Sequence, residues 1–190
     1  FVVVADIERT GYEPKDAKGN SYNKIFSGTL DFQGHTLSFP EETSYGPVFN
    51  SLTSTGVIEN IVFDYRRDPS SPFTQSAGLV NRNYGTIRNI VMKINMGRSQ
   101  PNWYTGLMTF VNEKSGVIEN FSVKIEKELH ARSSFGIVTA TNNGTIRKGA
   151  VYGKNVVLES LVYGGDIHTA SGVYGAIAYS NSATGVIEDV

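Results

Sequence analysis

The chain of 190 residues contains no cysteine, which excludes both a disulfide framework and a thiolate zinc site. No apolar run approaches the roughly 20 residues that a membrane-spanning helix needs, so no membrane span is expected. The sequence also has no surplus of charge of either sign. Its 17 lysines and arginines nearly balance its 18 aspartates and glutamates, which leaves a formal net charge of −1. Without a basic surplus, nucleic acid is not an expected partner.

The motifs of common hydrolases are missing too. A His-Glu-x-x-His zinc peptidase needs two histidines one helical turn apart, but His35, His130 and His168 are isolated in the sequence. Gly-x-Ser-x-Gly does not occur, and without cysteine there is no thiol nucleophile. The sequence therefore predicts no catalytic residue, no metal ligand and no cofactor within this chain.

An imperfect repeat is what the sequence does contain. Each copy has a glycine followed by apolar residues and then Gly-Val-Ile or Gly-Thr-Ile. The repeated isoleucine falls, with steps of 29, 31, 28 and 41 residues, at Ile58, Ile87, Ile118, Ile146 and Ile187. Steps of this size are typical of solenoids, in which each repeat forms one coil and variation in length falls in loops.

The parity of the apolar residues indicates a bend inside each repeat. Ile58 occupies an even-numbered position, whereas Ile61, Phe63 and Tyr65 occupy odd-numbered positions. The next two copies show the same change of parity after the repeated isoleucine. Because alternate residues of a strand share one face, a change of parity requires a corner at the intervening Glu-Asn or Arg-Asn pair. Asparagine tolerates left-handed backbone, so we expect the corner residues of neighbouring coils to stack, namely Asn60, Asn89 and Asn120.

Short strands separated by such corners, with no helical period of useful length, predict an all-β fold. The expected architecture is a right-handed parallel β-helix (β-solenoid) of about six imperfect coils in a single domain over residues 1–190. An immunoglobulin-like sandwich is the weaker alternative, because its strands would not repeat one motif in register. The approximate coils are 1–23, 24–44, 45–76, 77–104, 105–134, 135–173 and the incomplete 174–190.

The residue after each repeated isoleucine alternates in charge. Stacked parallel strands place equivalent residues about 4.8 Å apart, so alternating signs would attract where like signs would repel. We therefore expect a structural column that fixes the register of the coils, formed by Glu59, Arg88, Glu119, Arg147 and Glu188. The alternative is chance alternation on a solvated face.

Residues 26–37, with the sequence Phe-Ser-Gly-Thr-Leu-Asp-Phe-Gln-Gly-His-Thr-Leu, and the preceding segment 1–7 resemble the opening of bacterial surface proteins with GLUG-type repeats. The Gly-Leu-Val and Gly-Thr-Ile-Arg-Asn copies continue the similarity. Within that group the chain is most similar to the β-helical N-terminal region of immunoglobulin A proteases and related zinc metallopeptidases. Departures are Phe32 in place of glycine, Lys148-Gly149 in place of an Asn-apolar pair, and the 41-residue step.

This resemblance implies a secreted or cell-surface, cell-wall-associated bacterial protein. It also implies a non-catalytic scaffold or recognition module that positions a substrate or host partner for a metallopeptidase domain elsewhere in the chain. Host immunoglobulin, another host protein or a glycan, and the catalytic domain of the same chain are the expected partners. We expect more protein beyond each end, since the first residues have no basic leader region and the last repeat is incomplete.

Two other functions stay open. One is a stand-alone adhesin-like repeat domain that binds a host glycan or protein. The other is a polysaccharide lyase or hydrolase, for which paired carboxylates would be needed. Asp64, with Asp68 beside it, is the best candidate, but the following coils offer Lys93 and Lys124 at the position of Asp64.

Lateral segments that follow the second strand of each coil are the best place for partner binding. They span residues 66–73, 97–104, 128–132 and 153–171 and should leave one edge of the solenoid. Exposed tryptophan, tyrosine and arginine are enriched at interaction hot spots. The candidate partner-binding residues are Arg66, Arg67, Arg98, Trp103, Tyr104, Arg132 and Tyr163. The alternative is that the aromatic residues among them only cover the edge of the coils.

Overall fold

The fold is a parallel β-solenoid. The computed structural model describes residues 1–8, 24–39, 47–66, 78–95, 105–127, 129–131, 135–154, 156–158, 161–163, 166–168 and 174–190. Every regular element in these residues is a β-strand, as the all-β prediction requires. The described residues accordingly include no helix that is long and apolar enough to cross a membrane.

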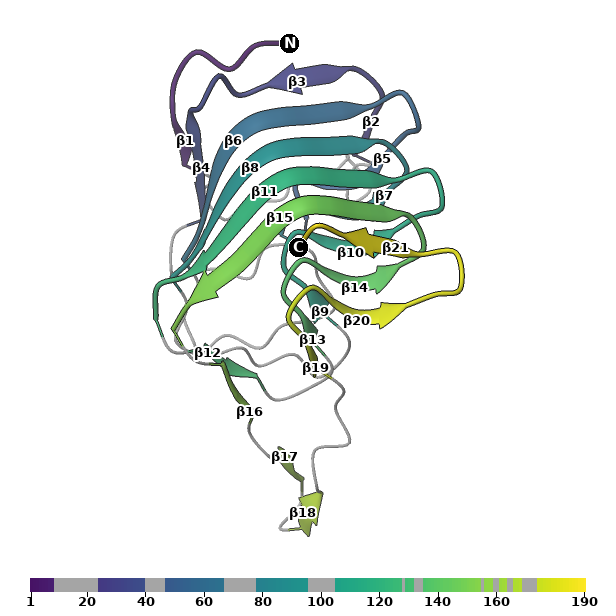
Figure 1. The fold of residues 1–190 in the computed structure, drawn as a ribbon. Coiled ribbons are helices and arrows are strands. Elements are labelled where there is room, and N and C mark those ends of the chain that lie inside the picture. Colours follow the sequence, from purple (N-terminus) through teal and green to yellow (C-terminus); the bar gives the residue numbers. More distant parts are fainter. Residues whose placement is uncertain are drawn as a thin grey trace, which may run out of the picture.

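Long parallel strands form the main sheet (Figure 1). Its four nine-residue members are β6 (Val57–Tyr65), β8 (Thr86–Ile94), β11 (Val117–Ile125) and β15 (Thr145–Gly153). They are flanked in the order β1-β4-β6-β8-β11-β15-β21 by shorter strands, with β3 also paired to β6. The shorter strands are β1 (Ile7–Glu8), β3 (Thr29–Asp31), β4 (Thr36–Phe39) and β21 (Val186–Glu188).

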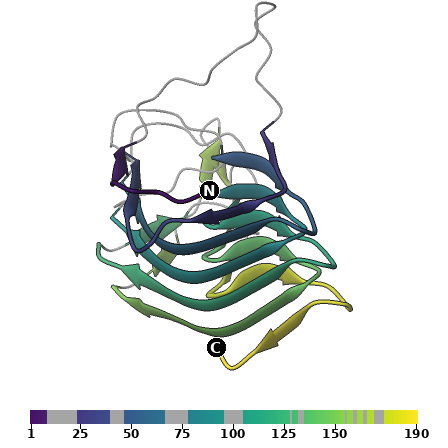
Figure 2. The same cartoon turned by 90° about the horizontal axis from the view of Figure 1, so that it is seen from above.

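A second parallel sheet supplies the other wall of each coil. Its order β2-β5-β7-β10-β14-β20 follows that of the main sheet, as expected when each coil contributes one strand to each wall. The members are β2 (Ile25–Phe26), β5 (Phe49–Leu52), β7 (Val80–Asn83), β10 (Thr109–Asn112), β14 (Thr139–Asn142) and β20 (Ala178–Asn181). Figure 2 shows the coils stacked along one axis, with the two termini at opposite ends of the stack.

Shorter strands complete the described chain. A third parallel sheet has the order β19-β13-β9 and consists of β9 (Thr105–Gly106), β13 (Phe135–Gly136) and β19 (Tyr174–Gly175). A parallel pair joins β12 (Leu129–Ala131) to β16 (Val156–Leu158). The antiparallel exception is the pair of β17 (Leu161–Tyr163) and β18 (Asp166–His168).

The number of coils is smaller than the prediction of about six. Four full-length strands stack from β6 to β15, so the described solenoid makes about three complete turns. The repeat count overestimates the turns because partial copies at each end contribute only short strands, such as β1 and β21.

The repeated isoleucines form the centre of the core. Ile58, Ile87, Ile118 and Ile146 are partners in neighbouring strands, and all four side chains are fully buried. After the corner the inward-pointing residues change parity, as predicted: they are Ile61, Phe63 and Tyr65 in β6, Ile90, Met92 and Ile94 in β8, and Phe121, Val123 and Ile125 in β11. Columns of equivalent apolar side chains therefore fill the interior, and their burial is the main stabilising term of the fold.

Each long strand bends at the predicted corner. The corner residues have positive φ angles of 57° at Asn60, 57° at Asn89, 52° at Asn120 and 54° at Lys148. Asparagine adopts this left-handed conformation more readily than most residues, and the lysine keeps the same geometry where the repeat departs from asparagine. The bend lets one strand present inward residues of both parities.

Candidate interaction surface

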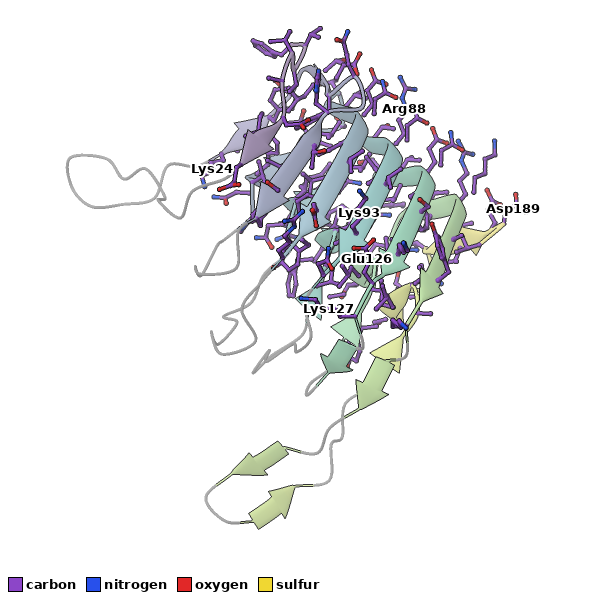
Figure 3. The ribbon with its side chains drawn as sticks, turned by 90° about the vertical axis from the view of Figure 1, so that its left-hand side faces the viewer. Lys24, Arg88, Lys93, Glu126, Lys127 and Asp189 are labelled. Atoms are coloured by element: carbon purple, nitrogen blue, oxygen red, sulfur yellow. The ribbon has the colours of Figure 1, made fainter. Side chains whose placement is uncertain are left out.

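The outer face of the main sheet carries the charged column. Residues 59, 88, 119, 147 and 188 are aligned as direct partners of neighbouring parallel strands. Arg88 Nε donates to Glu59 Oε2 at 2.7 Å, and Arg147 Nε donates to Glu119 Oε2 at 2.9 Å. Figure 3 shows Arg88 and, further along the same strand, Lys93 on this side of the molecule.

Contacts within the charged column are made in separate pairs. In the described part of the chain, no ion pair joins Arg88 to Glu119, and none joins Arg147 to Glu188. The side chains of Glu59 and Glu119 are 14% and 16% exposed, so each arginine covers much of its own glutamate. The sequence pattern predicted attraction on both sides of each residue, whereas the side chains pair with one neighbour only.

A further ion pair lies on the second sheet and was not predicted from the sequence. Arg82 in β7 donates through Nε to Glu113 Oε1 at 2.8 Å, and this hydrogen bond raises the pKa of the arginine. The two residues are 31 positions apart, which is one coil. This separation is the available sequence signal, but neither residue belongs to the repeated Gly-x-Ile motif.

The corner asparagines stack through their side-chain amides. Asn89 Nδ2 donates to Asn60 Oδ1 at 2.8 Å, and Asn120 Nδ2 donates to Asn89 Oδ1 at 3.4 Å. Asn60 Nδ2 in turn donates to Asp31 Oδ1 at 2.8 Å, and the Gln33 backbone N–H donates to the same oxygen. These two hydrogen bonds, that of Asn60 first, lower the pKa of Asp31. The Asp31 carboxylate is thus the last hydrogen-bond acceptor in a row of asparagine side chains, each of which donates toward the N-terminal coil.

A second set of asparagines was missed by the sequence analysis; Asn83, Asn112 and Asn142 are fully buried, and Asn181 at the end of the set is exposed. Asn83 Nδ2 donates to Asn112 Oδ1 at 2.8 Å, Asn112 to Asn142 at 2.8 Å, and Asn142 to Asn181 at 2.7 Å. We call these four residues the buried asparagine ladder. Its donors point toward the C-terminal coil, opposite to those of the corner asparagines. A signal existed, because each of the four precedes the glycine of the Gly-x-Ile motif by two or four residues.

Asp64 occupies an unusual place on the outer face. Its neighbours Phe63 and Tyr65 point into the core, so alternation along the strand directs Asp64 outward, yet Asp64 is only 3% exposed. Arg66 Nε donates to Asp64 Oδ2 at 2.7 Å, while Asp64 Oδ1 is buried and has no hydrogen-bond partner among the residues that the structure describes.

No second acid stacks on Asp64. The register places Ser38 on one side of it and Lys93 on the other, with Lys124 following Lys93. Lys124 forms an ion pair with Glu126 at 3.3 Å. Within the described ranges, no group of three or more histidine or acidic side chains could hold a metal ion. Among the described residues, the arrangement at Asp64 is therefore a buried carboxylate paired with Arg66.

The three histidines lie apart in the fold. His35 Nδ1 is 3.3 Å from Asp6 Oδ1, and the backbone N–H of Thr36 donates to the same oxygen at 2.7 Å. That backbone hydrogen bond is the main reason for the lowered pKa of Asp6. His130 belongs to β12 and His168 to β18, and the side chains of both lie outside the described part of the structure.

The long strands end together at one edge of the solenoid. Tyr65, Ile94, Ile125 and Gly153 are partners in register, so the segments that follow them start side by side. Figure 3 shows Glu126 and Lys127 just beyond the end of β11 at this edge. The lateral segments were predicted to leave one edge of the solenoid, and the aligned strand ends place the starting points of these segments at one edge.

Most of the predicted partner-binding residues fall in segments that the structure does not describe. Arg66 is described, is exposed and is paired with Asp64. The backbone of Tyr163 lies in β17, although its side chain is outside the described set. The residues that lie wholly outside the described ranges are Arg67, Arg98, Trp103, Tyr104 and Arg132.

The fold and this surface together define a β-solenoid whose outer face carries paired charges and whose lateral segments begin at one edge. Comparison with known protein families, with curated proteins and with solved structures finds no match for this chain.

Proposed function

We propose that this chain is a non-catalytic scaffold or recognition module of a secreted or cell-surface bacterial protein. In this proposal it positions a substrate or a host partner for a zinc metallopeptidase domain elsewhere in the same protein. The observation that carries the proposal is the in-register ending of the four long strands, at Tyr65, Ile94, Ile125 and Gly153. A rigid stack that starts variable segments from one edge can present several contact groups to one partner.

The resemblance to GLUG-type repeats and to the N-terminal region of immunoglobulin A proteases supports the extracellular and bacterial part of this proposal. The finer architecture is proposed on general grounds. Connections between parallel strands of one sheet are right-handed in about 98% of cases, so we infer a right-handed coil.

A polysaccharide lyase or hydrolase receives less support from the outer face. Such hydrolases need two carboxyl groups roughly 5 to 9.5 Å apart. Asp64 has Ser38 and Lys93 as its neighbours in register and an arginine on its own strand. This environment suits a structural ion pair better than a catalytic acid. A stand-alone adhesin differs from our proposal only in needing no other domain to act.

The proposal is tested by binding of the purified chain to immunoglobulin A and to a broad glycan array, with product analysis of the same mixtures by mass spectrometry. We expect binding to one class of ligand without any cleaved product. Cleavage by the chain alone would contradict a non-catalytic role, and absence of binding to both ligand classes would contradict a recognition role.

A matched pair of variants then locates the binding surface. Trp103→Ala, in the lateral segment after β8, should weaken binding about tenfold or more if that segment holds a hot spot. Arg82→Ala removes an exposed arginine on the second sheet, away from the edge where the lateral segments start, and should leave binding unchanged. Equal effects of the two substitutions would argue against binding through the lateral segments.

A further inference from the structure

Residues of three neighbouring strands form a continuous patch on the outer face of the main sheet. Val91 and Lys93 belong to β8, Ser122 and Lys124 to β11, and Tyr152 to β15. Val91 is the partner of Ser122, and Lys93 is the partner of Lys124, which Tyr152 follows in register. Val91 is 42% exposed, and Figure 3 shows Lys93 on this face. We call these five residues the outer patch.

The two lysines of the outer patch are like charges in direct register. Neighbouring strands are about 4.8 Å apart, and like charges opposite each other destabilise a sheet. The charged column on the same sheet avoids this cost, because its signs alternate and its members form ion pairs. A position that breaks a local rule without a structural gain is expected to serve a function.

Neighbouring carboxylates leave this pair of lysines incompletely neutralised. Lys124 contacts Glu126 at 3.3 Å, but its side chain is 50% exposed. Asp64 is the other partner of Lys93 in register, yet it pairs with Arg66, and no described residue forms an ion pair with Lys93.

Further cations lie close to the outer patch. Lys127 and Lys154 are exposed just beyond the ends of β11 and β15. The described residues of this region therefore carry more positive than negative charge, although the chain as a whole has a formal net charge of −1. A local positive surplus favours an anionic partner.

We propose that the outer patch binds an acidic glycan, a sugar chain that bears carboxylate or sulfate groups. One such group accepts charge-assisted hydrogen bonds from Lys93 and Lys124, which removes the repulsion between them. Register and alternation along β15 place Tyr152 on the same face, where its ring offers an apolar surface to a sugar ring beside the anionic group.

An acidic sugar suits the outer patch better than nucleic acid does. A phosphate backbone is held by many cations, whereas the outer patch has two lysines on a chain without a basic surplus. The inference does not depend on the proposed function, because it concerns the face of the main sheet and not the lateral segments.

Binding of defined sugars to the full chain tests the inference. The probes are a hyaluronan octasaccharide, whose anionic groups are carboxylates, and a heparin octasaccharide, which also carries sulfates, with neutral maltooctaose as the control. Isothermal titration calorimetry measures the affinity of each. We expect at least one acidic sugar to bind, more weakly at high salt because exposed charges are screened, and maltooctaose not to bind.

Matched lysine variants assign this binding to the outer patch. Lys93→Gln should weaken binding of the acidic sugar about three- to tenfold. Lys114→Gln removes the same charge from an exposed site before β11, at the opposite end of that strand from Lys124, and should leave binding unchanged. Tyr152→Phe should keep the affinity and Tyr152→Ala should lower it, because the ring makes the contact.

Several results would overturn the proposal. Equal effects of Lys93→Gln and Lys114→Gln would mean that any lysine suffices. Failure of both acidic sugars to bind, equally tight binding of maltooctaose, or equally tight binding of a short DNA duplex would contradict an acidic-glycan site. Trp103→Ala should leave binding of the acidic sugar unchanged, so this proposal and that for the lateral segments can fail separately.

Discussion

Asn83 donates a hydrogen bond from its side-chain amide to Asn112 Oδ1, across 2.8 Å, in a part of the interior where both side chains are fully buried. Asn112 Nδ2 in turn donates a hydrogen bond to Asn142 Oδ1. A slip of one residue between these coils would leave amide groups buried without partners, which is costly in an apolar interior. The ladder therefore adds a second constraint on the register that the buried apolar columns already favour.

Replacing one member of the buried asparagine ladder should destabilise the fold strongly. Asn112→Ala leaves the Asn83 amide without its acceptor and the Asn142 oxygen without its donor. We expect the free energy of unfolding to fall by about 2 to 4 kcal/mol, since each buried polar group left unpaired costs about 1 to 3 kcal/mol. Urea unfolding followed by circular dichroism measures the loss.

The corner asparagines provide the matched control. Asn120 makes a longer bond of 3.4 Å at an exposed site and has a φ angle of 52°. Asn120→Gly keeps that left-handed conformation accessible and should cost less than about 1 kcal/mol. Losses of similar size for Asn112→Ala and Asn120→Gly would show that burial of the ladder contributes little.

Close packing of successive coils leaves no room for a side chain at Gly85. A Cβ atom on Gly85 would lie 2.2 Å from the Gly56 carbonyl oxygen and 2.4 Å from that of Thr53. Because both oxygens belong to backbone of the preceding coil, Gly85→Ala must push the coils apart, and we expect a loss of about 3 kcal/mol or more.

Gly28→Ala is the corresponding control, because its Cβ would meet only side-chain atoms of Phe26 and Phe1 at 3.5 Å or more. This variant should change the melting temperature by no more than a few degrees. If thermal unfolding shifted equally in the two alanine variants, close approach of the backbones at Gly85 would not be the cause.

Stability should depend on the ionisation of Asp31. The hydrogen bonds from Asn60 and from the Gln33 backbone hold the pKa of this carboxyl below its ordinary value. A lowered folded-state pKa gives a stabilisation that is complete above the unfolded-state pKa, about 4, and that is lost as the pH falls through the folded-state value.

The variant Asp31→Asn tests this dependence. It should be less stable than the unchanged protein at pH 7, and the difference should shrink as the pH falls below about 4. The measurement is the free energy of unfolding of both proteins between pH 2.5 and 7. If the difference in the free energy of unfolding stayed constant over this range, the charge of the Asp31 carboxylate would not contribute to stability.

Much of the fold could be predicted from the spacing of a few residues. The repeat of Ile58, Ile87, Ile118 and Ile146 indicated stacked coils, and the change of parity placed the corner at Asn60. These features are periodic, so one sequence suffices to find them. The buried asparagine ladder was missed because its separation from the repeated glycine varies between two and four residues, which hides it from an alignment on that glycine.

Other features depend on side-chain conformation and could not be read from the sequence. Register alone places Arg88 between Glu59 and Glu119, and only the rotamer decides that it contacts the former. The burial of Asp64 was likewise invisible, because an outward position on a strand predicts exposure unless other parts of the chain cover it. The candidate binding surface was predicted by residue type, and most of its members fall outside the described ranges.

We expect opposite charges on neighbouring coils to help fix the register of those coils, and a charge-swap cycle on Glu59 and Arg88 measures this contribution. Glu59→Arg should destabilise the fold modestly in urea unfolding, and adding Arg88→Glu should restore part of the loss, with a coupling energy of about 0.5 kcal/mol. Restoration is only partial because residue 88 would then be a glutamate in register with Glu119. If the losses of the two single variants simply add in the double variant, the charges do not interact and the claim is wrong.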